Sequence, residues 1–184
     1  MSGLAPPAHY NFLIPVKDLD ASLKSQYESL TKCANNFDCF HDYYEGLAFA
    51  KSQNKPILLD FTGYGCVNCR KTEEHIWVHD EVRRKINEDF VLVSLYVDDK
   101  EPLDTTIFSA VQNKRIKRVG DMWSDFQITN FKQNSQPLYV LLSPDQQVLT
   151  TPRGYDPDVE AYDAFLECGL NAFKELNAPV LGSN

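Results

Sequence analysis

Two short apolar runs, "ILLDF" at residues 57–61 and "FVLVSLYV" at residues 90–97, form the clearest pattern in the chain. Continuous apolar runs of this length are typical of strands that are buried on both faces of a sheet. Residues 69–87 between them are polar, with apolar positions recurring at helical spacing. The pattern therefore predicts a strand, a helix and a second strand. The right-handed crossover of such a unit implies that the two strands pair in parallel.

Two helices are predicted before this unit. The first lies within residues 19–30, where a leucine or tyrosine recurs every three or four positions. The second has Phe40, Tyr44, Leu47 and Ala48 on one face and ends near "SQNKP", where Asn54 and Pro56 stop the pattern. Residues 1–16 hold three of the ten prolines and show little periodicity, so we expect an extended arm there.

The second half of the chain predicts a less regular section, a hairpin and a last helix. Residues 98–130 are irregular, with an amphipathic helix near "MWSDFQITNF". Residues 136–150, "QPLYVLLSPDQQVLT", predict two antiparallel strands joined by a Ser-Pro-Asp turn. In the last helix, the predicted buried side carries Tyr162, Phe165, Leu166, Gly169, Leu170 and Phe173.

Together these elements predict an α/β fold with a central mixed sheet flanked by helices. The 184 residues fit one domain with a sizeable core. We expect an N-terminal extension with a short helix over residues 1–40, the folded domain over residues 41–176 and a tail over residues 177–184.

Composition excludes some classes of function. The chain has 43% hydrophobic and 24% charged residues, as ordinary globular proteins do. Its net charge of -8 disfavours nucleic acid as a partner, and the one basic cluster, "NKRIKR" at residues 113–118, is expected to be solvated surface. No apolar run reaches the roughly 20 residues that span a bilayer. The first ten residues lack the features of a secretory signal, so they do not indicate the compartment.

Cys66 and Cys69 fall where the first strand passes into the helix, which suits a reactive thiol. Free backbone N–H groups and the helix dipole at this point favour a thiolate and lower the pKa of the first cysteine from roughly 8.5. The second thiol lies one turn further on and is more protected. We therefore expect Cys66 to be the nucleophile and Cys69 to be the resolving thiol.

A zinc site is the main competing interpretation of this pair, because His75 and His79 could add two ligands to the two cysteines. On one continuous helix, however, both histidines point nearly opposite to Cys66. An inert, packed pair is also disfavoured, since Gly63 and Gly65 leave the junction open.

Two carboxylates stand near the pair. Asp60 interrupts an apolar strand, where a charge is costly unless it has a task. The alternative is an aspartate that turns to solvent or caps the next helix. Glu73 falls on the helix face of Cys69, although solvation alone also explains a glutamate there. If both approach the thiols, they raise the pKa of Cys66 and oppose the helix dipole, so the net shift has no predicted sign.

The other cysteines are weaker signals, and their total of five leaves at least one outside any internal pairing. Cys33 and Cys39 either close a small disulfide loop or are two unrelated thiols. Cys168 follows Phe165 by three positions, so we expect a buried, inert thiol on the last helix. His9 and His41 give no usable signal.

The patterns "KPILLDFTGYGCVNCRKTE" at residues 55–73 and "SQPLYVLLSPD" at residues 135–145 resemble thioredoxin-fold proteins. The resemblance is strongest to the C-terminal periplasmic domain of the DsbD family of thiol:disulfide interchange proteins, and it covers residues 42–173. It implies an acidic residue, Asp60, beneath the cysteine pair. It also implies a role for Glu73, a cis peptide bond before Pro137 and an insertion before the cis-proline strand. The chain departs from the family at Gly65, where a tryptophan is usual.

The resemblance also implies a function: a thiol:disulfide oxidoreductase, specifically an electron-relay domain that reduces disulfides in partner proteins outside the cytoplasm. Cys66, Cys69, Asp60 and Glu73 would then be catalytic. The residues implied to contact a partner are Tyr64, Gly65, Val67, Asn68, Gln136 and Pro137. No cofactor or metal is expected beyond the Cys66–Cys69 disulfide.

The implied partners are disulfide-containing proteins and an upstream electron donor embedded in the membrane. The implied location is the periplasm, as a soluble domain of a membrane-anchored protein. Two alternatives remain open. One is a cytochrome c maturation reductase, or an oxidase, of the same fold. The other is a non-catalytic binding module whose cysteines are structural or bind zinc.

Overall fold

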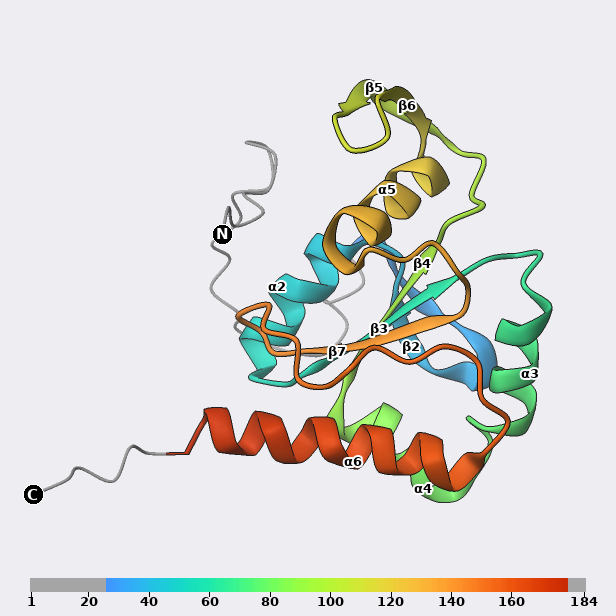
Figure 1. Cartoon of the computed structure of the whole chain (residues 1–184). Coiled ribbons are helices and arrows are strands. Elements are labelled where there is room, and N and C mark those ends of the chain that lie inside the picture. The colour runs from blue at the N-terminus through green and yellow to red at the C-terminus, as the bar shows by residue number, and fades with distance from the viewer. Residues whose placement is uncertain (1–25, 179–184) are drawn as a thin grey trace, which may run out of the picture.

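The computed structural model describes residues 26–178 and is built around a five-stranded mixed sheet (Figure 1). Its strands are β1 (Leu30–Lys32), β2 (Asp38–Phe40), β3 (Ile57–Thr62), β4 (Val91–Tyr96) and β7 (Leu138–Leu142). They lie side by side in the order β1-β2-β4-β3-β7. β4 pairs in parallel with both β2 and β3, whereas β1 and β7 are antiparallel to their neighbours. The predicted parallel pair and mixed sheet are confirmed.

Helices cover both faces of this sheet (Figure 1). α2 (Tyr43–Gln53) and α5 (Val119–Phe131) pack on one face; α3 (Val67–His75), α4 (Asp80–Arg84) and α6 (Val159–Leu176) lie against the other. Successive residues of a strand point to opposite faces, which splits β3 between the two cores. Leu59 therefore packs with α2 and α5, and Leu58 packs with α6.

α2 begins at Tyr43, three residues after the Phe40 with which its apolar pattern starts. The Asp42 carboxylate accepts hydrogen bonds from the backbone N–H groups of Tyr44 (2.8 Å) and Glu45 (3.0 Å) and so caps the first turn. Phe40, which we expected on this helix, belongs to β2 instead. Its side chain still packs into the α2 core, which explains why it fits the periodic pattern.

The predicted helix over residues 69–87 is broken into α3, α4 and a π-helical turn, η3 (Lys85–Asp89). The break follows from burial, because Ile76 and Trp77 turn into the core directly after α3. There the Trp77 indole N–H donates a 2.9 Å hydrogen bond to the Tyr162 hydroxyl of α6. On a continuous helix, the neighbouring side chains of Ile76 and Trp77 would point in different directions and could not both enter the core.

Residues 98–130 contain the predicted helix, now α5, and a hairpin that the pattern did not predict. The hairpin consists of β5 (Pro102–Ser109) and β6 (Lys114–Arg118). Most of its side chains are exposed, so it lacks the apolar alternation of a half-buried strand. The basic residues of β6 are solvated, as expected. The hairpin is fixed to α5 by Asp125, which accepts hydrogen bonds from the Ser109 hydroxyl and the Gln112 side chain.

The chain after β7 differs from the predicted two-stranded hairpin. Only isolated bridges, Leu142 with Val148 and Tyr139 with Arg153, stand where the second strand was expected. α6 follows as predicted. Its Gly169 packs against β7 so closely that a Cβ atom there would lie 2.3 Å from the Leu141 side chain. Leu170 and Phe173 are only half-buried.

The N-terminal part of the sheet begins earlier than the domain start expected at residue 41. The paired strands β1 and β2 are only three residues long, too short to show a period of two in the sequence. Leu30, the last residue of the helix predicted over residues 19–30, opens β1, and the rest of that helix lies mainly outside the described residues. Within residues 26–178, no helix combines the length and the apolar character needed to cross a bilayer.

Candidate active site

Cys66 and Cys69 are joined by a disulfide at the start of α3, with an S–S distance of 1.97 Å and a Cα–Cα distance of 5.3 Å. Cys66 is the N-cap residue, and its Sγ accepts a hydrogen bond of 3.2 Å from the backbone N–H of Cys69. Cys66 is half-buried, whereas Cys69 is 1% exposed. The predicted difference in protection between the two sulfurs is confirmed.

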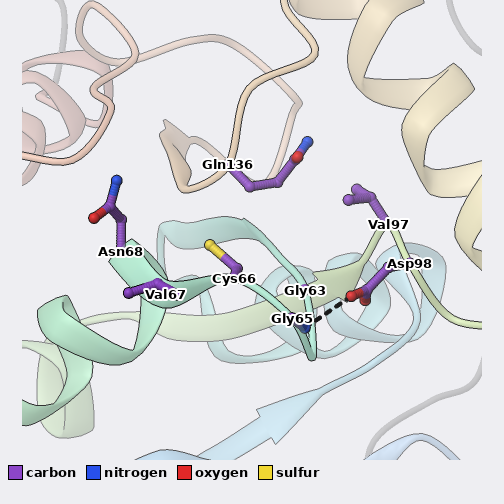
Figure 2. A pocket seen from close by; sticks show the side chains of 8 residues that line it. All are labelled: Gly63, Gly65, Cys66, Val67, Asn68, Val97, Asp98 and Gln136. Carbon is purple, nitrogen blue, oxygen red and sulfur yellow. Dashed lines mark hydrogen bonds between the residues drawn. The ribbon is translucent and has the colours of Figure 1, made fainter.

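The sulfur of Cys66 faces an open groove of about 380 Å³ (Figure 2). The groove is lined by Gly63, Gly65, Cys66, Val67, Asn68, Val97, Asp98 and Gln136. Four of the six residues that the resemblance implies for partner binding are therefore on its wall. Tyr64 stands beside it with a 63% exposed side chain, and Pro137 is buried behind Gln136.

The peptide bond between Gln136 and Pro137 is cis, as the resemblance implies. The Gln136 side-chain amide extends across the groove from Cys66 (Figure 2) and donates to the Gln127 side-chain oxygen at 2.9 Å. Gln127, buried in α5, in turn donates to the Ser135 carbonyl at 2.8 Å. Gln127 thus ties α5 to the loop before Pro137. In the sequence, Gln127 stands out only as a polar residue within the apolar pattern of a predicted helix.

Asp98 is a second residue that sequence reasoning missed. Its carboxylate accepts hydrogen bonds from the backbone N–H groups of Tyr64 (2.8 Å) and Gly65 (2.9 Å; Figure 2). Gly63 is needed for this approach, because a Cβ atom there would lie 3.0 Å from the carboxylate. Asp98 therefore fixes the loop that leads into Cys66 and places a negative charge on the groove wall.

Asp60 is buried in β3, 2% exposed, on the sheet face that also carries Leu58. The Ser94 hydroxyl donates to its Oδ2 at 3.2 Å, and Oδ1 has no partner among residues 26–178. Burial, with a contribution from the charge of Glu73, raises the pKa of Asp60 to about 7. The alternative of an aspartate that faces solvent or caps α3 is excluded, since Cys66 is the cap.

Glu73 is buried on the inner side of α3, 7% exposed, and lies 2.8 Å from the Arg70 guanidinium. Arg70 also donates to the Thr62 hydroxyl at 3.2 Å, which links α3 to the end of β3. Burial raises the pKa of Glu73, and the charge of Arg70 opposes that shift. Glu73 is therefore a buried, paired residue rather than a solvated surface glutamate.

The remaining cysteines and histidines are placed as follows. Cys33 and Cys39 form a second disulfide, which settles the alternatives left open by the sequence. Cys168 is exposed, so the expectation of a buried thiol is wrong: it lies outside the buried arc formed by Phe165, Leu166 and their neighbours. His75 and His79 are exposed, and within the described part of the chain they do not gather with Cys66 and Cys69.

A family model described as "Thioredoxin-like" matches residues 38–144, more than half of the chain. The chain belongs to the thioredoxin-like family. The match includes the cysteine pair, Asp60, Glu73 and the cis-proline loop. It begins at β2, which agrees with the early start of the sheet.

A mouse protein, "Spermatogenesis-associated protein 20" of Mus musculus, is 31% identical to this thioredoxin-like chain over 108 residues. The match covers 59% of this chain but only 13% of the relative. The relationship therefore concerns one segment of that much longer protein.

Solved structures with the same fold include "DsbH Oxidoreductase", with 18% identity, coverage of 85% of this chain and 95% of that one, and a TM-score of 0.53. A thioredoxin from Thermus thermophilus has 14% identity, coverage of 78% and 95%, and a TM-score of 0.56. The C-terminal domain of DsbD from Neisseria meningitidis, in its reduced form, has 14% identity, coverage of 66% and 88%, and a TM-score of 0.46. At these identities the likeness to the first two structures concerns the fold alone, and the expected thioredoxin-like fold is confirmed by the family model and by the second of them.

Proposed function

We propose that this thioredoxin-like chain is a thiol:disulfide oxidoreductase that, in its dithiol form, reduces disulfides in partner proteins. The observation that carries the proposal is the placement of the two sulfurs. Cys66 caps α3 and faces an open groove, and Cys69 is bonded to it from the buried side. A backbone N–H already points at the Cys66 sulfur and would stabilise a thiolate there.

The reaction follows from these positions in two steps. The Cys66 thiolate attacks a partner disulfide, so that a bond forms between Cys66 and the partner and the first partner sulfur leaves as a thiolate. Cys69 then loses its proton and attacks the Cys66 sulfur. The Cys66–partner bond breaks and the second partner sulfur leaves. Two electrons pass to the partner, its two thiolates take up protons, and the Cys66–Cys69 disulfide remains.

Asp60 is the proposed proton acceptor for the second step. A carboxyl group with a pKa of about 7 both accepts and releases a proton near neutral pH, which suits general acid–base work. Its Oδ1, without a partner among residues 26–178, is available for such a proton. Glu73 raises the pKa of Asp60 through its charge, and Arg70 limits that effect.

The groove is the proposed site of the partner chain. Val67, Asn68 and Gln136 form two sides of it, with the Cys66 sulfur between them (Figure 2). Tyr64 lies between Gly63 and Gly65 of the groove wall, and its exposed ring stacks on Tyr96, with 4.3 Å between ring centroids. An exposed but fixed aromatic ring suits contact with a partner.

We further propose that the chain works in an oxidising compartment such as the periplasm and receives electrons from a membrane-embedded donor. The Cys33–Cys39 disulfide supports the compartment, because disulfides outside a catalytic pair persist mainly outside the cytoplasm. The difference in reduction potential between the chain and its partners sets the direction of transfer, where about 30 mV corresponds to 1.4 kcal/mol. A redox titration against glutathione therefore separates a reductase from an oxidase of the same fold.

The direct test is to trap the intermediate. A Cys69→Ser variant, mixed with an oxidised test protein, should accumulate a mixed disulfide through Cys66. The Cys66→Ser variant should not accumulate one, and Cys168→Ser should behave like the unchanged chain because Cys168 lies on α6. Absence of the Cys66 adduct in Cys69→Ser would sink the proposal and favour a non-catalytic binding module.

A further inference from the structure

We propose that Cys33, Cys39 and His41, once the Cys33–Cys39 disulfide is reduced, form a binding site for a Zn²⁺ ion. The two sulfurs and one imidazole nitrogen lie within 4.8 Å of one another. Two thiolates and an imidazole are a ligand set that zinc prefers. No role for His41 could be predicted from the sequence, because the pairing of β1 with β2 is what brings it close to Cys33.

The geometry fits a tetrahedral ion. Zinc lies about 2.3 Å from sulfur and about 2.0 Å from nitrogen, so neighbouring sulfur and nitrogen ligands are about 3.5 Å apart and two sulfurs about 3.8 Å apart. The Nε2 of His41 is already 3.4 Å from the Sγ of Cys33. Only the two sulfurs must separate, and their Cα atoms, 5.9 Å apart, can stay in place while the side chains rotate.

Contacts other than the disulfide also hold the segment that carries the three residues. The turn between Cys33 and Cys39 is closed by a 2.9 Å backbone hydrogen bond from Cys33 to Phe37. Asn35, within that turn, donates to the Glu73 carbonyl of α3 at 2.7 Å. The His41 ring packs on Tyr96, with 5.0 Å between ring centroids. The ligands are therefore kept close together when the sulfur–sulfur bond opens.

The three ligands leave the fourth coordination position of the proposed zinc ion open on the side that faces solvent. Cys39 is fully buried, whereas Cys33 and His41 are half-buried. The described residues supply three ligands, so a water molecule would take the fourth position on the exposed side.

Binding depends on the redox state of the pair. A dithiol reductant transfers two electrons to the Cys33–Cys39 bond, becomes a disulfide itself and leaves two thiols. Zinc then replaces the two thiol protons, which are released to solvent. A disulfide oxidant such as oxidised glutathione accepts two electrons from the two thiolates, so that the Cys33–Cys39 bond forms again while the oxidant's own sulfur–sulfur bond breaks. The two sulfurs of the oxidant take up protons and leave as thiols, and the zinc ion is released. The site is separate from the Cys66–Cys69 pair, so it stands or fails independently of the proposed reductase activity.

The test uses the full chain with the other cysteines removed, as the triple variant Cys66→Ser, Cys69→Ser and Cys168→Ser. This background protein is reduced with dithiothreitol, freed of reductant without oxygen, and titrated with Co²⁺ and then Zn²⁺. We expect one tetrahedral Co²⁺ with thiolate charge-transfer absorption, displaced by one equivalent of Zn²⁺. The oxidised background protein should bind neither ion.

Two further variants of the background distinguish ligands from chance contacts. His41→Ala should weaken zinc binding by more than about tenfold, since even the outer partners of metal ligands contribute 10- to 100-fold. His75→Ala, which removes an exposed histidine elsewhere, should leave the affinity unchanged. The proposal is overturned if the reduced background protein binds no zinc, if oxidation does not abolish binding, or if His41→Ala binds as tightly as His75→Ala.

Discussion

The Ser94 hydroxyl donates a 3.2 Å hydrogen bond to the Asp60 carboxylate, and both side chains are buried where they stand opposite each other on the parallel strands β4 and β3. This one bond does not offset the cost of placing a charge in the core, so the pKa of Asp60 rises from 3.8 to about 7. A buried carboxyl group that titrates near neutral pH has consequences for stability and for the reactivity of the thiols.

The first prediction concerns stability against pH. Between pH 3.8 and about 7 the folded state keeps the Asp60 proton that the unfolded state has lost. The stabilisation from Asp60 is therefore complete below pH 3.8 and lost as pH rises through about 7. The fall amounts to about 4 kcal/mol at most. Asp60→Asn should lack this fall, as measured by urea unfolding of the oxidised protein across this range.

The exposed Asp145, in the turn after β7, provides the control for this experiment. Asp145→Asn should keep the decline of the unchanged chain. An equal decline in Asp60→Asn would show that Asp60 is not responsible for it.

The second prediction concerns the thiols. Removing a buried negative charge near α3 lowers the pKa of a thiol, so Asp60→Asn and Glu73→Gln should each lower the pKa of Cys66 by about one unit or less. The rate of Cys66 alkylation against pH measures this. Glu74→Gln, at the neighbouring exposed position, should leave it unchanged. Identical titration curves in all variants would remove both carboxylates from the mechanism.

The third prediction concerns the loop before Cys66. Gly63→Ala places a Cβ atom 3.0 Å from the Asp98 carboxylate, which must move away from the N–H groups of Tyr64 and Gly65. We expect a loss of roughly 1 kcal/mol in the free energy of unfolding. The mixed disulfide through Cys66 should also form more slowly.

Gly65→Ala is the matched change, because its Cβ would lie 3.7 Å from the same carboxylate, an ordinary contact. Neither glycine has a positive φ, so alanine strains the backbone at neither position. Thermal unfolding should thus separate the two variants. Equal behaviour would mean that Asp98 does not organise the loop.

The fourth prediction concerns Gln127. Gln127→Leu leaves the Ser135 carbonyl without its donor and the Gln136 amide without one of its acceptors. We expect a loss of about 1–3 kcal/mol in stability and slower reduction of an oxidised test protein. Gln133→Leu, at an exposed position of the same loop, should change neither quantity. If the two variants reduce the test protein equally fast, the Gln127–Gln136 contact does not shape the groove.

Local patterns were sufficient for the centre of the fold. The apolar runs of β3 and β4 predicted two buried parallel strands, and the cysteine pair was placed correctly at the junction that follows β3. Both features depend on residues close together in the sequence. Asp60 could also be singled out, because a charge inside an apolar run is unusual whatever packs around it.

Other features depend on contacts that no local pattern records. The Asp98 carboxylate accepts a hydrogen bond from Gly65, which lies 33 positions away in the sequence. Gln127 contacts Gln136 of the groove wall only because α5 packs beside the loop before Pro137. The single helix expected over residues 69–87 breaks because Trp77 finds its hydrogen-bond partner on α6. The exposure of Cys168 was predicted wrongly because the close packing of α6 against β7 decides which side of this helix is buried.

The sequence by itself determined the sheet's two central strands and the place of the cysteine pair, and it singled out Asp60, because apolar patterning and the cost of a charge within an apolar run act locally. The burial of Asp60 was decided by the tertiary structure. Only the tertiary structure decided the walls of the groove, the ion pair of Glu73 with Arg70 and the meeting of His41 with Cys33. These arise where separate elements pack together, and their distances are set by the whole fold rather than by neighbouring residues.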